Sequence, residues 1–233
     1  MSELRVIPIE GMGEVRPGDD IADLIADCGA EILDGDCLVI TQKIVSKAEN
    51  RLVDIDPDDP LSHKPLVERE SVRILRRRGE LIISQTEHGF VCANAGIDLS
   101  NVERGQAALL PVDSDRSARG VRDRLRARHG LDVAIVVSDT FGRPWRRGVA
   151  DVAIGCAGIG AVADLRGTTD ALGRELMVTE VAIVDEIAAA ADLVMGKSKG
   201  VAVAIVRGLD PEWFRPGNVV DEIVRDPADD LFR

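Results

Sequence analysis

Three short, continuous apolar runs constrain the fold of this 233-residue chain more than any other feature. They cover residues 37–40, 133–138 and 201–206, and the second reads Val-Ala-Ile-Val-Val-Ser. Runs of this length, rich in Val and Ile and bounded by turn residues, are typical of strands that are covered on both faces. The sequence therefore predicts buried strands with helices packed against them.

The segments between these runs carry helical patterns. Residues 21–28 place Ile, Leu and Cys at the 3,4 spacing of one buried helix face, and Asp19 or Asp20 precedes them as a cap. Gly130 is typical of a left-handed helix end. Further helices are predicted over residues 66–78, from a cap at Ser114 or Asp115 to Gly130, over residues 177–195 with Gly196 as the stop, and within residues 217–225.

Other segments are predicted to be extended or irregular. Residues 4–10 alternate apolar and polar side chains, as a half-buried strand does. Residues 54–65 are rich in Pro and Asp and indicate an exposed loop. Additional strands are expected at residues 81–84, 90–94 and 107–112.

These patterns together favour an α+β fold with mixed or antiparallel sheets and flanking helices. A purely parallel α/β fold is less favoured, because extended neighbours within residues 81–97 can form hairpins. We expect one domain over residues 1–233, with room for two subdomains.

The composition argues against several classes of function. With 29 basic and 41 acidic residues the formal net charge is −12, and the aromatic residues are 4 Phe and 2 Trp. This charge repels nucleic-acid phosphates, and few rings are available to stack on bases. No run approaches the ~18 apolar residues of a membrane helix, and the N-terminus lacks a signal-peptide pattern, so we expect a cytoplasmic protein without membrane binding. The 4 cysteines form no C-x-x-C pair, which argues against a disulfide framework or a cysteine-rich zinc site.

Two aspartates follow extended runs at points where side chains can converge on a crevice. Asp98 lies in Asn94-Ala-Gly-Ile-Asp-Leu-Ser-Asn101, and Asp139 precedes Thr140 in Ser138-Asp-Thr-Phe-Gly-Arg143. Carboxylate and hydroxyl oxygens suit Mg²⁺ or Mn²⁺ bound to nucleotide phosphates. An Asp at a strand end is also often only a turn or helix cap. The nearby Arg143, Arg146 and Arg147 could neutralise an anionic substrate.

Glycine-containing turns provide weaker signals. Met195-Gly-Lys-Ser198 is not a Walker-type phosphate loop, because Ala191 replaces the required Gly and the segment closes a helix. It can still contact phosphate through backbone N–H groups and its lysines. Gly11-Met-Gly13 is most simply a plain turn. The spacing of His63, His88 and His129 supports no catalytic triad.

Several blocks in a fixed order resemble the coenzyme F420:L-glutamate ligase family. The resemblance extends from about residue 4 to residue 209. Its blocks are Pro8-Ile-Glu-Gly11, Arg16-Pro-Gly-Asp-Asp20, Asp34-Gly-Asp36, Val45-Ser-Lys-Ala-Glu49, the Asn94 to Asn101 segment, Leu110-Pro-Val-Asp113, Ser138-Asp-Thr140 with Gly142-Arg143, and Thr179-Glu180 with Asp185-Glu-Ile-Ala-Ala189.

This resemblance implies an activity and a set of partners. The implied enzyme is a GTP-dependent ligase that adds L-glutamate, and then further γ-linked glutamates, to coenzyme F420-0 through an acyl phosphate. It would use two divalent ions, Mg²⁺ or Mn²⁺, together with K⁺. It would also form an intertwined homodimer with an unusual α+β fold.

The resemblance also implies roles for individual residues. Asp98 and Asp139 would hold one metal ion and Thr140 the other, and both aspartates and Lys47 would be catalytic. The GTP contacts would come from Glu10, Gly11, Met12, Gly13, Thr41, Gln42, Lys47 and Asn101, completed by Met195, Gly196, Lys197 and Ser198.

One departure and two alternatives accompany the resemblance. In archaeal members an acidic or amide side chain occupies the position of Lys197 and helps to hold the second metal, which a protonated lysine cannot do. The flavin-reductase-like domain of two-domain relatives is absent, so a free-standing ligase is expected. The substrate could instead be a dehydro form of F420-0 or another phosphorylated acid. A nucleotide-binding protein without turnover is the alternative from a different class.

Overall fold

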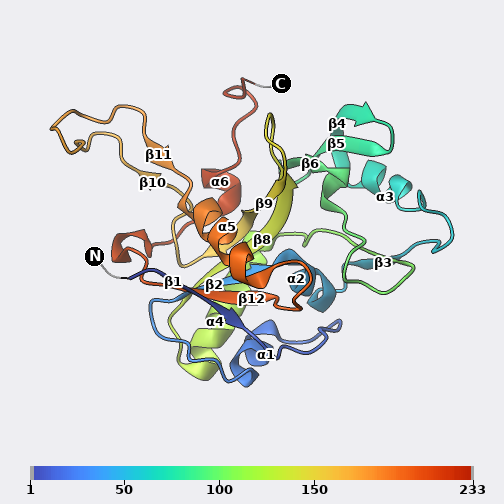
Figure 1. The fold of residues 1–233 in the computed structure, drawn as a ribbon, viewed down its shortest axis with the longest axis horizontal. Coiled ribbons are helices and arrows are strands. Elements are labelled where there is room, and N and C mark those ends of the chain that lie inside the picture. Colours follow the sequence, from blue (N-terminus) through green and yellow to red (C-terminus); the bar gives the residue numbers. More distant parts are fainter. Residues whose placement is uncertain (1–2, 232–233) are drawn as a thin grey trace.

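A computed structural model describes residues 3–231 of the chain (Figure 1). Its helices are α1 (Ile21–Asp27), α2 (Gln42–Ala48), α3 (Lys64–Arg69), α4 (Ser114–His129), α5 (Ile183–Met195) and α6 (Val219–Glu222), with short 3-10 turns η1 (Asn94–Gly96) and η2 (Pro211–Trp213). Its strands are β1 (Arg5–Ile9), β2 (Cys37–Thr41), β3 (Leu52–Asp54), β4 (Ser71–Arg78), β5 (Leu81–Thr86), β6 (Val91–Ala93), β7 (Gln106–Ala108), β8 (Ala134–Gly142), β9 (Val149–Ala157), β10 (Ala163–Asp164), β11 (Glu180–Val181) and β12 (Val203–Arg207).

A five-stranded sheet forms the centre of the molecule. Its strand order is β1-β12-β2-β8-β9, and only the β2–β8 pair is parallel. Three smaller sheets surround it: β4-β5-β6, β3-β7 and β10-β11. The predicted α+β class with mixed sheets is confirmed, and so are the three buried runs, which form β2, β8 and β12.

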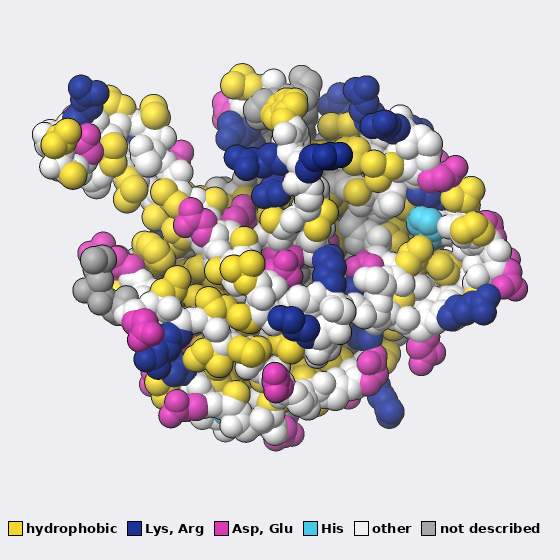
Figure 2. Space-filling view, viewed as in Figure 1, with side chains coloured by type: hydrophobic (Ala, Val, Ile, Leu, Met, Phe, Trp, Pro, Cys, Tyr) yellow, Lys and Arg dark blue, Asp and Glu magenta, His cyan; other side chains and the backbone are white. Residues whose placement is uncertain are grey.

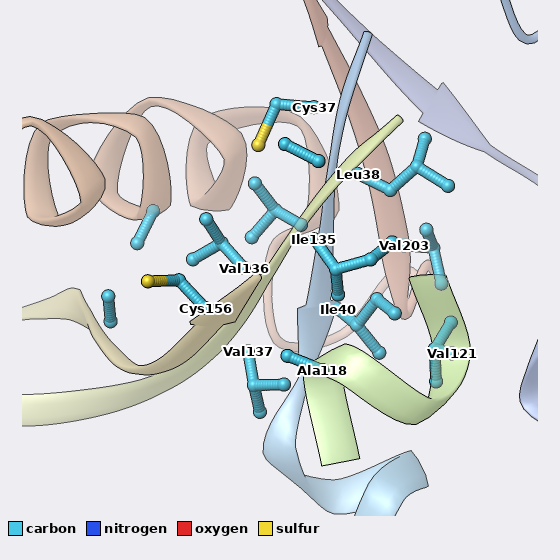
Figure 3. Packing of buried hydrophobic residues seen from close by; sticks show 14 of the residues in the cluster. Cys37, Leu38, Ile40, Ala118, Val121, Ile135, Val136, Val137, Cys156 and Val203 are labelled. Carbon is cyan, nitrogen blue, oxygen red and sulfur yellow. The ribbon is translucent and has the colours of Figure 1, made fainter. Parts of the chain in front are cut away.

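The core lies on both faces of this sheet. Every residue of β2 from Cys37 to Ile40 and of β8 from Ala134 to Ser138 is buried. Figure 3 shows Ile135, Val136 and Val137 of β8 beside Leu38 and Ile40 of β2, with Val121 of α4 packed near them. Helix α5 contacts β1, β12, β8 and β9, whereas α4 packs on β8 and β9 and against α1 (Figure 1). Within residues 3–231, no helix is long and apolar enough to cross a membrane.

The helix ends follow the expected chemistry with one correction. The Asp20 side chain caps α1 by accepting a hydrogen bond from the Ala22 N–H at 3.0 Å. Gly130 ends α4 in the left-handed region, with φ of 71°. The cap of α4 is Asp113, which accepts from the Arg116 N–H at 2.8 Å, and not Ser114 or Asp115 as predicted. Both of these residues are already buried within the first turn.

The predicted helix over residues 66–78 is correct only as far as Arg69 and wrong over the remaining residues 70–78. Helix α3 ends at Arg69, and the chain continues as β4, which pairs antiparallel with β5. The Ser71 and Ser84 hydroxyls hydrogen-bond across this pair, with their oxygens 2.7 Å apart. The helical spacing of apolar residues was outweighed by strand pairing, which only the neighbouring β5 can supply.

Two further differences concern the sheet surroundings. The predicted helix over residues 177–195 begins only at Ile183, because the preceding residues form β11 at the base of a projecting hairpin with β10 (Figure 1). Strand β9 was not predicted. Its Gly155 lies so close to α4 that an added Cβ would be 2.3 Å from the Ser114 carbonyl carbon. Close helix packing explains this small residue, which weakened the strand pattern.

The smaller sheets bring Asp98 to the central sheet. Phe90, just before β6, packs edge-on against Phe141 of β8, with ring centroids 6.2 Å apart. Asp98 then bridges to Ala108 of β7 through backbone hydrogen bonds of 3.0 and 2.9 Å. The loop between β6 and β7 is thereby fixed beside the end of β8.

Candidate active site

A cavity of about 480 Å³ opens where the parallel strands β2 and β8 end. Thr41 and Ser138 face each other in this register, and the chain after each of them lines the cavity. Ligands commonly bind at the carboxyl ends of parallel strands in α/β sheets. The polar residues that line it are Glu14, Thr41, Gln42, Lys43, Lys47, Asp98, Asn101, Ser138, Asp139, Thr140, Asp151, Asp192, Lys197 and Ser198.

Asp139 is the most perturbed carboxyl group of the cavity. Burial raises its pKa to about 7, and repulsion from Asp98 and Asp151 adds to this rise, against the opposing effects of the Thr140 N–H and Lys197. A bulge between Val137 and Ser138 precedes it on β8. A cation beside Asp139 would relieve this crowding of negative charge.

Asp98 has a different environment because a lysine neutralises it. Burial alone would raise the pKa of Asp98, but the hydrogen bonds from Lys43 and the Ser100 N–H, together with the lysine charge, lower it. Lys43 Nζ lies 2.8 Å from Asp98 Oδ2, and the Ser100 N–H donates to Oδ1 at 2.7 Å. Asp98 therefore remains ionised next to the more easily protonated Asp139.

Two more carboxylates face the cavity from β9 and α5. Asp151 is 4% exposed and accepts hydrogen bonds from the hydroxyls of Thr140, at 2.6 Å, and Ser138, at 2.9 Å. Burial raises the pKa of Asp192, and Asp151 raises it further, while Lys197 opposes the shift. The cavity wall around Thr140 is thus strongly acidic.

Helix α2 contributes positive charge and buried polar groups to the cavity. Lys47 is 9% exposed and forms an ion pair with Glu14 of the first loop. Gln42 is buried, and its Nε2 has no partner among the described residues. Ser46 lies 2.8 Å from the Gln42 amide oxygen and donates to the Leu109 carbonyl at 2.6 Å. The single hydrogen of the Ser46 hydroxyl goes to Leu109, so it cannot also go to the Gln42 amide oxygen. If the Gln42 amide is turned over, its NH₂ group donates to the Ser46 oxygen and is no longer unpartnered, which is consistent with a packing role for Gln42.

The turn after α5 closes the cavity. Gly196 caps α5 with φ of 57°, and Lys197 and Ser198 follow on the exposed side. The Asn101 side-chain amide donates to the Lys197 carbonyl at 3.5 Å. The two predicted nucleotide-contacting segments therefore meet at this point.

The structure brings most of the predicted site residues together and separates a few. Glu10 and Gly11 line a neighbouring cavity of about 720 Å³, which also contains Lys199. Arg143, Arg146 and Arg147 are exposed in the β8–β9 hairpin and do not line the main cavity. Figure 2 shows Lys and Arg side chains gathered around this hairpin. The predicted residues that share the main cavity are Met12, Gly13, Thr41, Gln42, Lys47, Asp98, Asn101, Asp139, Thr140, Met195, Gly196, Lys197 and Ser198.

A larger cavity of about 580 Å³ lies elsewhere and is a weaker candidate. Its arginines are already paired, since Arg122 bonds Asp132 at 2.9 Å and Arg215 bonds Glu222 at 2.8 Å. Carboxylates that repel one another, such as Asp139 and Asp151, are found instead in the cavity at the ends of β2 and β8.

The donor set of this cavity suits a hard divalent cation. Within the described residues, no group of three or more His, Cys, Asp or Glu side chains could by itself hold a metal ion. Asp98, Asp139 and the Thr140 hydroxyl supply a few oxygen donors on one side of the cavity. Mg²⁺ in particular is usually bound by one or two carboxylates, with substrate phosphates and water filling its other positions.

Sequence reasoning missed five polar residues of the cavity, one of which, Ser138, lies in a quoted motif but was given no role. Asp151 went unnoticed because β9 was not predicted, although a carboxylate within an apolar run was a usable signal. Lys43, Glu14 and Asp192 carry no local signal, because each acquires its neighbours only when distant segments meet.

Comparisons with known proteins agree on one family. The family model described as F420-0:Gamma-glutamyl ligase matches residues 11–208. The chain is 44% identical to the coenzyme F420:L-glutamate ligase of Methanopyrus kandleri, with 99% of this chain and 98% of that protein covered. It is 42% identical to the protein of the same name from Methanothermobacter thermautotrophicus, with 99% of each covered. For the Haloarcula marismortui protein of that name the identity is 36%, with 99% and 96% covered.

Proposed function

The chain belongs to the F420-0:gamma-glutamyl ligase family, and from this premise we propose that it joins L-glutamate to coenzyme F420-0 at the expense of GTP. GDP and phosphate are the other products, and further glutamates are added through γ-linkages. The observation that carries the proposal is the presence of two aspartates, Asp98 and Asp139, together with two lysines, Lys43 and Lys47, in one cavity of a chain that matches this family.

The chemistry requires an activated carboxyl group. An amine does not displace hydroxide from a carboxylate at a useful rate, so the carboxylate oxygen of F420-0 first attacks the γ-phosphorus of GTP and GDP leaves. The glutamate nitrogen then attacks the carbonyl carbon of this acyl phosphate. Phosphate leaves with the bonding electron pair, and the nitrogen loses a proton as the amide forms.

The acidic wall of the cavity would serve the transferred phosphoryl group through a cation. Asp98, Asp139 and Thr140 would hold one or two divalent ions, with K⁺ as a further cofactor. A bound Mg²⁺ or Mn²⁺ would neutralise charge that develops on the phosphate oxygens. The Thr140 oxygen faces this wall with its hydroxyl hydrogen already donated to Asp151.

The basic wall would hold the phosphates directly. Lys47 is buried and fixed near the cavity, so its ammonium group loses little freedom when it meets an anion. Its partner Glu14 would have to release it to the nucleotide. Lys197 lies close enough to Asp139 to lower the pKa of that carboxyl, so it can supply charge where archaeal relatives place a metal ligand.

The remaining nucleotide contacts would come from three segments that line the cavity. Met12 and Gly13 lie in the first loop, Asn101 lies in the loop between β6 and β7, and Ser198 lies in the turn after α5. Glu10 and Gly11 lie in the adjacent cavity and would contact the nucleotide only where it extends beyond the main one. A homodimer is part of the proposal, because the resemblance implies one.

A direct assay tests the function. The purified protein is incubated with GTP, Mn²⁺ or Mg²⁺, L-glutamate and F420-0, and products are analysed by mass spectrometry. We expect products heavier by one or more glutamyl units, formed with release of GDP. Parallel reactions with ATP or with the dehydro precursor identify the preferred substrates.

The control variants separate the site from general effects. Asp139→Asn should abolish glutamate addition, whereas Asp123→Asn on the exposed side of α4 should retain it. Undiminished GDP release and glutamate addition in Asp139→Asn would contradict the assigned site. The absence of any glutamyl product from the folded wild-type protein would contradict the function itself.

A further inference from the structure

Asp151 holds two hydroxyl groups of the neighbouring strand in a single orientation. It lies directly opposite Thr140 in the β8–β9 register. Ser138 lies two residues before Thr140 on the same face of β8, so the same carboxylate reaches it diagonally as well. Its Oδ1 accepts from Thr140 at 2.6 Å and its Oδ2 accepts from Ser138 at 2.9 Å. Both distances are normal for strong O–H···O hydrogen bonds.

These two bonds determine what the hydroxyls can offer to the cavity. A hydroxyl has one hydrogen and two lone pairs, and here each hydrogen points to Asp151. Ser138 and Thr140 both line the cavity, and only lone pairs remain on that side. Lone pairs attract a cation and repel a phosphate oxygen. This wall is therefore built for a cation, and anions belong to the wall of Lys47.

We propose that Asp151 is a positioning residue that fixes Ser138 and Thr140 as electron-pair donors to the divalent cation of the reaction. The proposal rests on the proposed function, because that function supplies the cation. In this role Asp151 acts through the two hydroxyls, whose hydrogen bonds its two oxygens accept. Asp151 and Ser138 are 4% and 1% exposed, whereas Thr140 is partly exposed toward the cavity.

The test measures Mn²⁺ binding without nucleotide, by calorimetry or by electron paramagnetic resonance of free Mn²⁺. Asp151→Asn keeps the shape but replaces one acceptor oxygen with an NH₂ group, so one hydroxyl hydrogen must turn toward the cavity. We expect Mn²⁺ to bind about 10-fold to 100-fold more weakly, as for other partners of metal-binding side chains. An affinity within twofold of wild type, in a folded variant, would overturn the proposal.

A matched variant controls for loss of folding. Asp115 is equally buried, 4% exposed, and also bonds β9, through the Cys156 N–H at 2.8 Å, but it does not line the cavity. Asp115→Asn should lower the melting temperature and leave Mn²⁺ affinity unchanged. A similar loss of Mn²⁺ binding in both variants would mean that general destabilisation explains the effect, against the proposal.

A third background separates positioning from direct ligation. In the Ser138→Ala, Thr140→Val double variant the hydroxyls are absent, so adding Asp151→Asn should remove only the through-space attraction of its charge, at most about fivefold in Mn²⁺ affinity. A further tenfold loss would make Asp151 itself a ligand and overturn the positioning role. Ser138→Ala alone, the mildest change, should weaken Mn²⁺ binding severalfold even if Asp151→Asn does not fold, and an unchanged affinity would contradict the proposal.

The Mn²⁺ binding measurement and the ligase assay test the two proposals independently, so either proposal can be refuted without the other. Glutamate addition by wild type together with unchanged Mn²⁺ affinity in Asp151→Asn would remove this inference and leave the proposed function intact. A wild-type protein that shows the predicted Mn²⁺ effects but adds no glutamate would retain the cation site and lose the proposed function.

Discussion

The two ends of strand β9 hold carboxylates in opposite situations. Near its C-terminal end, Asp115 accepts from the N–H groups of Cys156, Val219 and Val220 at 2.8, 2.9 and 3.3 Å. Near its N-terminal end, Asp151 shares the cavity with four other carboxylates, and the described donors to its two oxygens are both hydroxyls. One end of the strand is saturated with donors, and the other is short of positive charge.

A second carboxylate strengthens the contrast at the saturated end. Glu222 accepts from the N–H groups of Ala161 and Val162, at 3.0 and 3.2 Å, and pairs with Arg215 at 2.8 Å. Burial alone would raise the pKa of Glu222, but these donors and the arginine charge lower it. This group stabilises the fold in its ionised state.

The cavity end shows the reverse. Burial and like charges raise the pKa of Asp139 to about 7, and they also raise the pKa of Asp192. Such groups reduce the stability of the ligand-free protein and gain a favourable partner only when a cation arrives. The comparison teaches that buried acids stabilise the fold where backbone donors surround them, and prepare a binding site where other acids do.

The largest expected effect lies at the saturated end. Asp115→Ala would leave two buried N–H groups and a third, partly buried one without an acceptor, and each buried group costs about 1 to 3 kcal/mol, so the free energy of unfolding should fall by about 3 kcal/mol or more. Urea denaturation followed by circular dichroism measures this. The ligase rate per folded molecule should be unchanged, and a specific loss of rate without destabilisation would break the comparison.

The next effect is on catalysis at the cavity end. Asp139→Asn removes one of the two carboxylates that would hold the cation, which is worth several kcal/mol of transition-state stabilisation. We expect the rate of glutamate addition to fall by more than about a hundredfold at saturating GTP. Initial rates from product mass spectrometry measure this loss, with Asp123→Asn as the exposed control.

The same carboxyl group gives a smaller effect on stability, with a defined pH dependence. The folded pKa of Asp139, about 7, lies above its unfolded value of 3.8, so its contribution to stability is present at low pH and is lost as pH rises through 7. One pKa unit corresponds to about 1.4 kcal/mol, and water in the cavity reduces the full effect.

The measurement compares two proteins at two pH values. Without ligand, wild type should lose stability between pH 5 and pH 8 relative to Asp139→Asn. The difference in unfolding free energy, Asp139→Asn minus wild type, should therefore increase by about 2 kcal/mol over this range. Urea titrations at both pH values test this. A gap that shrinks toward pH 8 would mean that Asp139 has enough donors, like the acids at the saturated end.

The sequence predicted elements whose signal is local. The Val-rich and Ile-rich runs correctly predicted β2, β8 and β12, and Gly130 correctly predicted the end of α4. The residues of β4 were wrongly predicted to be helical, because they form a strand only through pairing with β5. Strand β9 was missed because its small residues, such as Gly155, reflect packing against α4. Elements that are defined by partners distant in sequence cannot be identified from their own residues.

The candidate site divides in the same way. Asp98 and Asp139 were selected because each follows an extended run, and the structure places both in one cavity. The ion pair of Lys43 with Asp98 joins segments that no sequence pattern relates. Charge compensation within the cavity was therefore unpredictable, although the acids that need it were found.

The smallest expected effect concerns that compensation. Lys43 is the closest cation to Asp98, at 2.8 Å, and it competes with a divalent ion for the same carboxylate. Its Nζ also donates to Ser100 at 2.8 Å, which keeps it in place.

Ion pairs that are partly open to water are worth up to about 1 kcal/mol, so Lys43→Met should tighten Mn²⁺ binding about fivefold in the absence of nucleotide. Arg104→Met, which removes a fully exposed pair with Asp58, should leave the affinity unchanged. If Lys43→Met instead weakens Mn²⁺ binding, Lys43 orients Asp98 for the cation. The acids at the cavity end of β9 would then be fixed by nearby donors, as Asp115 and Glu222 are at the other end.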